Sequence, residues 1–354
     1  MDKLIITKWA DFNAVVRQHN LSKIALDFEC QSASYLNLDT AGFSICNGEV
    51  AFYVDILDNP QKRELINMLQ WLCSDVVKLL ICHNFPFDGR ILKQLDIKHT
   101  DNIICTMTIQ HLLNENKPKG LKWLSKNILH KERATVMFVD AVNSGFHSAK
   151  FYEYATDDAI DTWDLYQYQL PQLKKQELWD LWYNIERPFQ YCLRDLAING
   201  VLVDKDNLVA AQEQTTQDVN ELEIEMYKSA GVSYYTQMLL DGGYEIIPKV
   251  NLNSPKQLVE LLSHLGVKLT VTTDGKPDSQ LSTKESVLTS VKHQHPFVEL
   301  LLKYRTMSKL LNGFLIPLPK FIQGDGRIRS TFHNVVAVTG RLSSSKPNLQ
   351  QLPK

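Results

Sequence analysis

The chain has 354 residues, of which 44% are hydrophobic, and its 38 lysines and arginines nearly balance its 40 aspartates and glutamates. A chain of this length exceeds one ordinary hydrophobic core, so two domains are expected. No window approaches the roughly 20 apolar residues of a membrane span, and the N-terminus lacks a signal-peptide pattern. Six cysteines without a CxxC pair or zinc-ligand spacing indicate reduced thiols. These features predict a cytoplasmic protein with no membrane partner.

Positive charge gathers towards the end of the chain. Residues 301–354 contain nine lysines and arginines against the single Asp325. A basic segment on a nearly neutral chain favours a polyanion as partner, because neutralising phosphates releases condensed counterions. The alternative is an ordinary solvated basic surface.

The first 170 residues alternate short β-branched runs with helical patterns, which is typical of an α/β domain. Asn47-Gly48, between two apolar runs, predicts a hairpin turn, so the sheet should mix antiparallel and parallel pairs. Strands are expected at 23–29, 50–56 and 78–84, and helices at 62–74, after Asp88, at 120–129 and at 152–170.

Beyond Pro171 the strand signal fades, and long amphipathic helical stretches follow. A domain boundary is therefore expected between residues 170 and 187. The helical stretches lie at 173–197, 205–230, 255–265 and 283–314.

Two acidic residues lie two positions apart in the strand segment ALDFEC. Asp27 and Glu29 therefore point to one face of the strand, and Phe28 points to the other, into the core. Two carboxylates at the end of a buried strand repel each other and lose hydration, and a bound cation compensates both costs. An ordinary strand end is the alternative reading of so short a pattern.

A third carboxylate follows the next strand, in KLLICHNFPFDG. Asp88 stands near the start of an expected helix, where it is either a helix cap or a ligand group at a strand end. Asn84 either ties the turn or contacts substrate.

A fourth carboxylate belongs to YEYATDDAIDTWD. Tyr154 and Asp158 are four residues apart, so on a helix they share a face, with the phenol beside whatever the carboxylate binds. Three neighbouring aspartates are expected to form a solvated flank instead: Asp157, Asp161 and Asp164.

The four carboxylates suffice for two divalent cations with open coordination positions, and hard oxygen ligands favour Mg²⁺ or Mn²⁺. Two such ions hydrolyse a phosphodiester without a side-chain nucleophile, because one activates water and the other stabilises the leaving 3′ oxygen. If both ions lie at the foot of a cleft, only an unpaired 3′ end with a few splayed bases can reach them. Phe85, Phe87 and Tyr154 are expected to stack on those bases.

The order D-x-E, N-x-x-x-D after a strand, and Y-x-x-x-D in a helix resembles the three motifs of proofreading exonuclease domains of the DEDDy class. The resemblance implies an α/β, ribonuclease H-like domain over residues 1–178 with a mixed five-stranded sheet. It implies that Tyr154 positions the hydrolytic water and that Asn84 is the motif asparagine. The implied metal ligands are Asp27, Glu29, Asp88 and Asp158.

Two residues depart from the family pattern. Cys30 stands where a threonine often follows D-x-E, and Pro86 interrupts the second motif. Neither change removes a ligand, so both bear on substrate placement.

Residues 182–208 resemble the segment that leads out of the exonuclease domain in family A DNA polymerases, with E-x-P, N-G-V and a following aspartate. Asn199-Gly200 is expected to end one helix, and Asp204 or Asp206 to start the next. The resemblance implies a mainly helical connector and thumb-like region over residues 179–325.

The segment VNLNSPKQLVELLSHLGV resembles the thumb tip. Ser254 and Lys256 at its helix N-terminus are expected to contact phosphates. A plain capped helix is the alternative.

Residues 326–354 resemble the first strands of the polymerase palm, through GRIRSTFHNVVAVTGRLSSSKPNLQQLP. The resemblance implies that Arg341 contacts the minor groove or a phosphate, and that Asn348 and Gln350 are polar contacts. Family members usually have asparagine where Gln351 stands. Polymerase motifs further along the family's palm and fingers are absent from this chain, so polymerisation by this chain alone is not expected.

The leading expectation is a 3′–5′ exonuclease that forms the N-terminal, proofreading part of a family A polymerase used in DNA replication. One alternative is a DNA-binding accessory subunit, or half of a split polymerase, that is active only with a second polypeptide carrying palm and fingers. A ribonuclease of the same class is the other alternative, against which the thumb-like half speaks.

Overall fold

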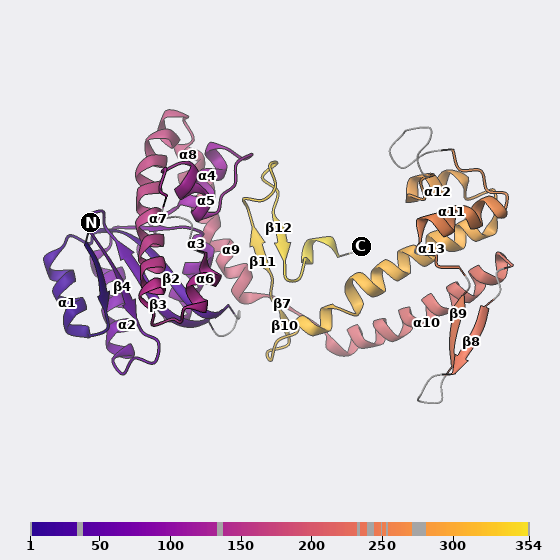
Figure 1. Ribbon diagram of the computed structural model, residues 1–354, viewed down its shortest axis with the longest axis horizontal. Coiled ribbons are helices and arrows are strands. Elements are labelled where there is room, and N and C mark those ends of the chain that lie inside the picture. The colour runs from indigo at the N-terminus through magenta and orange to yellow at the C-terminus, as the bar shows by residue number, and fades with distance from the viewer. Residues whose placement is uncertain are drawn as a thin grey trace. The chain divides into compact units, whose positions relative to one another are not determined.

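The computed structural model describes residues 2–33, 38–132, 137–231, 234–238, 244–248, 250–252, 254–270 and 281–352 (Figure 1). They form two compact units, one extending to Val201 and including Arg329–Gln351, the other built on Leu202–Ile328. No helix among these described residues is both long and apolar enough to cross a membrane.

The described part of the first unit contains a six-stranded mixed sheet in the order β1-β4-β3-β2-β5-β6. The pairs β1–β4, β2–β5 and β5–β6 are parallel, and β2–β3 and β3–β4 are antiparallel. The mixed sheet is confirmed, but it has six strands and not five. Four of the five residues of the edge strand β1 are exposed, although its sequence DKLII ends in three apolar residues. The strands are β1 (Asp2–Ile6), β2 (Lys23–Ala33), β3 (Leu38–Cys46), β4 (Val50–Asp55), β5 (Leu79–Cys82) and β6 (Ile103–Cys105).

The hairpin expected at Asn47-Gly48 joins β3 to β4. Asn47 Oδ1 accepts the backbone N–H groups of Glu49 at 3.0 Å and Val50 at 2.9 Å. Gly48 has φ +91°, and a Cβ there would lie 2.6 Å from the indole nitrogen of Trp163. Only glycine therefore suits this turn.

Helices pack around the sheet, and the longest, α7, crosses β2, β3 and β4 (Figure 1). Ser148 caps α7 by accepting the N–H of Phe151 at 3.1 Å. The first-unit helices, including π-helical turns, are α1 (Trp9–Gln18), α2 (Lys62–Trp71), η1 (Leu72–Val76), α3 (Phe85–Gln94), α4 (Thr106–Leu113), α5 (Leu121–Asn127), α6 (Phe138–Asn143), α7 (Ala149–Lys175), α8 (Trp179–Leu181), η2 (Trp182–Glu186) and α9 (Arg187–Asn199).

The sequence places the domain boundary between residues 178 and 179, whereas the first unit of the structure continues to Val201. Trp182 is fully buried in the core of the first unit, and α9 packs against α3. Gln190 on α9 is also fully buried. These helices belong to the first unit because their buried side chains complete its core.

The second unit is mainly helical, as expected. Helices α10 and α13 run side by side (Figure 1). A separate core holds Met226, Leu258, Phe297 and Leu301, each fully buried. The elements are α10 (Lys205–Ser229), β8 (Tyr234–Met238), β9 (Tyr244–Pro248), α11 (Pro255–His264), α12 (Glu285–Val291), α13 (Pro296–Leu310), η3 (Leu311–Leu315) and η4 (Leu318–Phe321).

Short elements complete the chain. Helix α9 ends before Gly200, which has φ +59°, and Asp204 caps α10 by accepting the N–H of Asn207 at 3.0 Å. Both helix boundaries were expected, and Asp204 is the cap of the two candidates. The remaining elements are β7 (Val201–Leu202), which pairs with β10 (Arg327–Ile328), the antiparallel pair β11 (Thr331–His333) and β12 (Ser343–Ser345), and η5 (Leu349–Gln351).

Candidate active site

Three acidic side chains from two elements meet beside the sheet. Asp27 and Glu29 extend from one face of β2, and Asp158 extends from α7, which crosses that strand. One carboxylate oxygen of each lies within 4.8 Å of the other two. Phe28, between them, points the other way and packs against Phe43 with 5.9 Å between ring centroids. Strand alternation therefore places the acids as expected.

Asp88 borders this cluster. Its Oδ1 accepts a hydrogen bond, 3.2 Å long, from the backbone N–H of Phe28. Phe28 is the residue between Asp27 and Glu29. Its Oδ2 is buried and has no hydrogen-bond partner among the described residues. Asp88 is not the helix cap, because Asn84 holds the N-cap position of α3. A buried carboxylate oxygen without a donor suits a bound cation.

Tyr154 lies one helical turn before Asp158 on α7. Burial raises the pKa of the Tyr154 phenol, and the nearby Asp158 carboxylate raises that pKa further, so the phenol stays protonated. The expected pairing of phenol and carboxylate on one helical face is present.

Burial makes the ionised cluster costly. It raises the pKa of Asp88 to about 8 and that of Asp158 to about 6. Burial also raises the pKa values of Asp27 and Glu29 well above their usual range, and repulsion from neighbouring carboxylates adds to the shift. Four acids with this electrostatic cost and hard oxygen donors fit divalent cations such as Mg²⁺ or Mn²⁺.

Lys122 on α5 is a member of the site that the sequence motifs did not identify. Its ammonium forms an ion pair with Asp158 and lies 4.1 Å from the centroid of the Tyr154 ring. No short motif marks it, since it lies in an ordinary amphipathic stretch 32 residues before Tyr154.

The solvated flank expected on α7 is wrong. Asp157 and Asp161 are buried. Lys3 pairs with Asp157 at 2.8 Å, and Lys131 pairs with Asp161 at 2.6 Å and with half-buried Asp164 at 2.5 Å. Lysines from distant segments neutralise these acids, which the helix sequence alone does not reveal.

Phe85 is also misassigned as a base-stacking residue. Its ring is fully buried and packs edge-on against Tyr191, with 5.1 Å between centroids. Phe87 is half-buried, with the Arg90 guanidinium 5.4 Å from its ring centroid. Asn84 is half-buried and adopts φ +77° at the start of α3. Its side chain makes no capping hydrogen bond, so the turn depends on its backbone conformation.

The expected phosphate contacts of the thumb-like region lie in the second unit. Ser254 is the N-cap residue of α11, without a side-chain capping hydrogen bond, and Lys256 is exposed in the first turn. These two residues belong to the second unit, and the carboxylate cluster belongs to the first.

The three polar residues expected near a primer terminus lie in the β11–β12 region. Arg341 is exposed just before β12. Asn348 Oδ1 accepts the Ser344 hydroxyl at 3.1 Å and the Gln350 backbone N–H at 3.2 Å. Asn348 therefore holds the turn after β12, while the Gln350 side chain is exposed.

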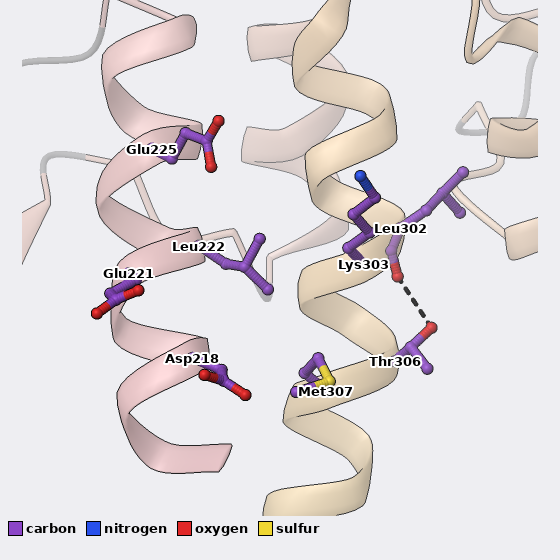
Figure 2. A pocket seen from close by; sticks show the side chains of 8 residues that line it. All are labelled: Asp218, Glu221, Leu222, Glu225, Leu302, Lys303, Thr306 and Met307. Atoms are coloured by element: carbon purple, nitrogen blue, oxygen red, sulfur yellow. Dashed lines mark hydrogen bonds between the residues drawn. The ribbon is translucent and has the colours of Figure 1, made fainter. Parts of the chain in front are cut away.

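A hollow of about 600 Å³ in the second unit is unsuited to a phosphate backbone. It lies between α10 and α13, and Asp218, Glu221 and Glu225 are acidic members of its lining (Figure 2). These carboxylates repel phosphates. The remaining lining residues are Leu222, Leu302, Lys303, Thr306 and Met307.

Two family models match the chain. Residues 4–174 match the model described as 3′-5′ exonuclease, and residues 205–354 match DNA polymerase family A. The first match contains the carboxylate cluster, and the second contains the helical unit and the β11–β12 region.

Curated relatives are DNA polymerases of bacteria. DNA polymerase I of Borreliella burgdorferi is 28% identical over 345 residues, with 93% of this chain and 35% of the relative covered. A thermostable DNA polymerase I of Thermus filiformis is 33% identical over 209 residues, with 58% of this chain and 23% of the relative covered. The chain thus spans about a third or less of the length of these relatives.

A solved structure has the same fold along the chain. The POL domain of Pol1 from M. smegmatis, in complex with DNA primer-template and dNTP, matches with a TM-score of 0.76 at 21% identity. The match covers 99% of this chain and 56% of that one. At this identity the likeness concerns the fold alone.

Proposed function

Because the chain belongs to DNA polymerase family A and contains that family's 3′–5′ exonuclease domain, we propose that it removes nucleotides from single-stranded or frayed DNA 3′ ends. The observation that carries the proposal is the convergence of Asp27, Glu29 and Asp158 within 4.8 Å, with Asp88 hydrogen-bonded to the strand between the first two. On this proposal the exonuclease is the proofreading part of a replicative polymerase.

Two divalent cations, Mg²⁺ or Mn²⁺, are the proposed cofactors. When bound, such ions lower the pKa of water and stabilise charge on the departing 3′ oxygen. The residues that would hold them are Asp27, Glu29, Asp88 and Asp158. Each must be ionised to do so, and cation binding therefore releases protons from the carboxyls whose pKa values burial raises.

Tyr154 is the proposed water-positioning residue. Its protonated hydroxyl lies beside Asp158, where it orients a water molecule by hydrogen bonding. A duplex end must unpair before its terminal phosphodiester reaches carboxylates buried beside a sheet, and mispaired ends unpair at lower cost. This difference favours removal of mismatched nucleotides.

DNA contacts outside the cluster are proposed from charge and exposure. Arg341 and Lys256 are exposed cations suited to phosphates, and Gln350 offers an exposed amide. Ser254 and Asn84 remain proposed polar contacts.

Nucleotide release from a 5′-labelled single-stranded oligonucleotide tests the function. We expect a ladder of products shortened from the 3′ end in Mg²⁺, no products in EDTA, and at least about a hundredfold slower release by Asp27→Asn. Asp164→Asn, on the same helix as Asp158 but paired with Lys131, is the matched control and should retain activity. Equal release by wild type and Asp27→Asn contradicts the proposed site. An RNA oligonucleotide of the same sequence measures the sugar preference.

A further inference from the structure

Lys122 places a positive charge inside the carboxylate cluster. Its side chain is 18% exposed and forms an ion pair with Asp158, whose side chain is 8% exposed. The same ammonium lies 4.1 Å from the centroid of the Tyr154 ring, in cation–π contact. Lys122 therefore contacts both members of the Y-x-x-x-D motif.

The charge of Lys122 acts on three acids at once. Burial raises the pKa values of Asp27, Glu29 and Asp158, and the Lys122 ammonium opposes that shift at each of them. Buried carboxylates this close require a compensating cation, and a lysine side chain supplies one from within the chain.

We propose that Lys122 is a built-in counter-ion, which a divalent cation must displace from Asp158 when it binds. The proposal rests on the proposed function in assigning these carboxylates to metal binding. Ammonium and metal ion compete for the same carboxylate, and two cations at contact distance repel each other. The flexible four-carbon stem of lysine allows the ammonium to withdraw.

Displacement has a consequence for Tyr154. While Lys122 lies over the ring, its ammonium holds the phenol through the ring face. Withdrawal of the ammonium removes this contact. Lys122 thus acts as a positioning residue that couples the phenol to cation binding.

The test measures Mn²⁺ affinity without DNA, from the electron paramagnetic resonance signal of unbound Mn²⁺. Lys122→Met removes the competing charge and keeps an unbranched side chain. We expect Lys122→Met to bind Mn²⁺ roughly tenfold or more tightly than wild type, because a unit charge at contact distance is removed. Lys122→Arg keeps the charge and should bind Mn²⁺ with an affinity close to that of wild type.

Thermal unfolding provides a second readout. In EDTA, Lys122→Met should unfold at a lower temperature than wild type, because its buried carboxylates lose their counter-ion. Saturating Mn²⁺ should raise the midpoint more in the variant than in wild type. Lys126→Met, an exposed lysine one turn along α5, is the matched control and should change neither quantity.

If wild type binds Mn²⁺ and Lys122→Met binds it equally or more weakly, Lys122 is not a counter-ion that the metal displaces. The nuclease proposal is then unaffected. Absence of Mn²⁺ binding by wild type overturns both. Circular dichroism establishes that each variant is folded, and Lys122→Gln replaces the methionine variant in the same titration if the latter does not fold.

Discussion

At the scale of single residues, the proposed reaction depends on the hydroxyl group of Tyr154, near Asp158. Tyr154→Phe removes that hydroxyl and leaves the four carboxylates in place. We expect the turnover number for nucleotide release to fall by roughly a hundredfold, the size of a typical proton-handling contribution, with Mn²⁺ affinity within about threefold of wild type.

Tyr152→Phe is the control for this prediction. Tyr152 is two residues away on α7, and its hydroxyl donates to Asp55 at 2.7 Å, outside the cluster. Its loss should leave turnover close to that of wild type. Equal effects of the two substitutions would mean that Tyr154 has no role beyond the stability of α7.

His83 gives the protein a defined sensitivity to acid. It is buried after β5 and its Nδ1 lies 2.8 Å from the Thr106 hydroxyl. Burial lowers the pKa of His83 to about 4, so below its usual pKa of 6.5 the unfolded chain binds a proton more readily than the folded one. The stability contributed by neutral His83 is therefore complete above pH 6.5 and is lost as the pH falls through about 4.

His83→Gln removes this titration. Urea unfolding at pH 7 should show the variant to be less stable than wild type, and the gap in free energy of unfolding should narrow at pH 4.5. A gap of constant size at both pH values would show that His83 is not held neutral.

At the scale of elements, buried ion pairs hold α7 against the rest of the first unit. The side chain of Asp161 is 1% exposed, and it depends on Lys131, which reaches it at 2.6 Å. Lys131→Met removes this ammonium from a buried carboxylate and should lower the free energy of unfolding by about 3 kcal/mol. The double variant with Asp161→Asn should recover much of the loss, measured by urea unfolding at pH 7. Additive losses in the double variant would exclude this coupling.

Local sequence patterns predict those features of the helices and strands that depend on residues close together in the chain. Periodicity found α7 and α10, and the Asn47-Gly48 pair found the β3–β4 turn, because these features depend on neighbours along the chain. The spacing of Asp27 and Glu29, and of Tyr154 and Asp158, also gave their shared faces correctly.

Partners from distant segments explain what the sequence missed. The environment of Phe85 depends on Tyr191 of α9, and that of Asp161 depends on Lys131. Lys122 reaches Asp158 across 36 residues of sequence. No sequence period or motif encodes such pairings. For this reason the sequence predicts that Phe85 stacks on bases and that Asp161 is solvated, although both are buried.

At the scale of the whole molecule, each unit has a hydrophobic core of its own. The carboxylate cluster belongs to the first unit, and the second unit is mainly helical. All six tryptophans of the chain precede Val201, so tryptophan fluorescence reports on the first unit, whereas far-ultraviolet circular dichroism reports on helices of both. A cation that binds only the folded first unit stabilises that unit by mass action.

We therefore expect Mn²⁺ to raise the thermal midpoint measured by tryptophan fluorescence. Circular dichroism also reports the unfolding of the second unit, which tryptophan fluorescence does not detect. The midpoint of that second transition should stay at the same temperature. Asp27→Asn should lose most of the shift. A Mn²⁺ effect confined to the signal from the second unit would place the binding site elsewhere.

Asp27, Glu29, Asp88 and Asp158 are proposed to hold divalent cations together. Anomalous scattering from a crystal of the protein soaked in Mn²⁺ tests this arrangement. We expect two manganese peaks among these four carboxylates, with the Lys122 ammonium withdrawn from Asp158. Well-ordered carboxylates without manganese between them, at a Mn²⁺ concentration that supports nucleotide release, would contradict it.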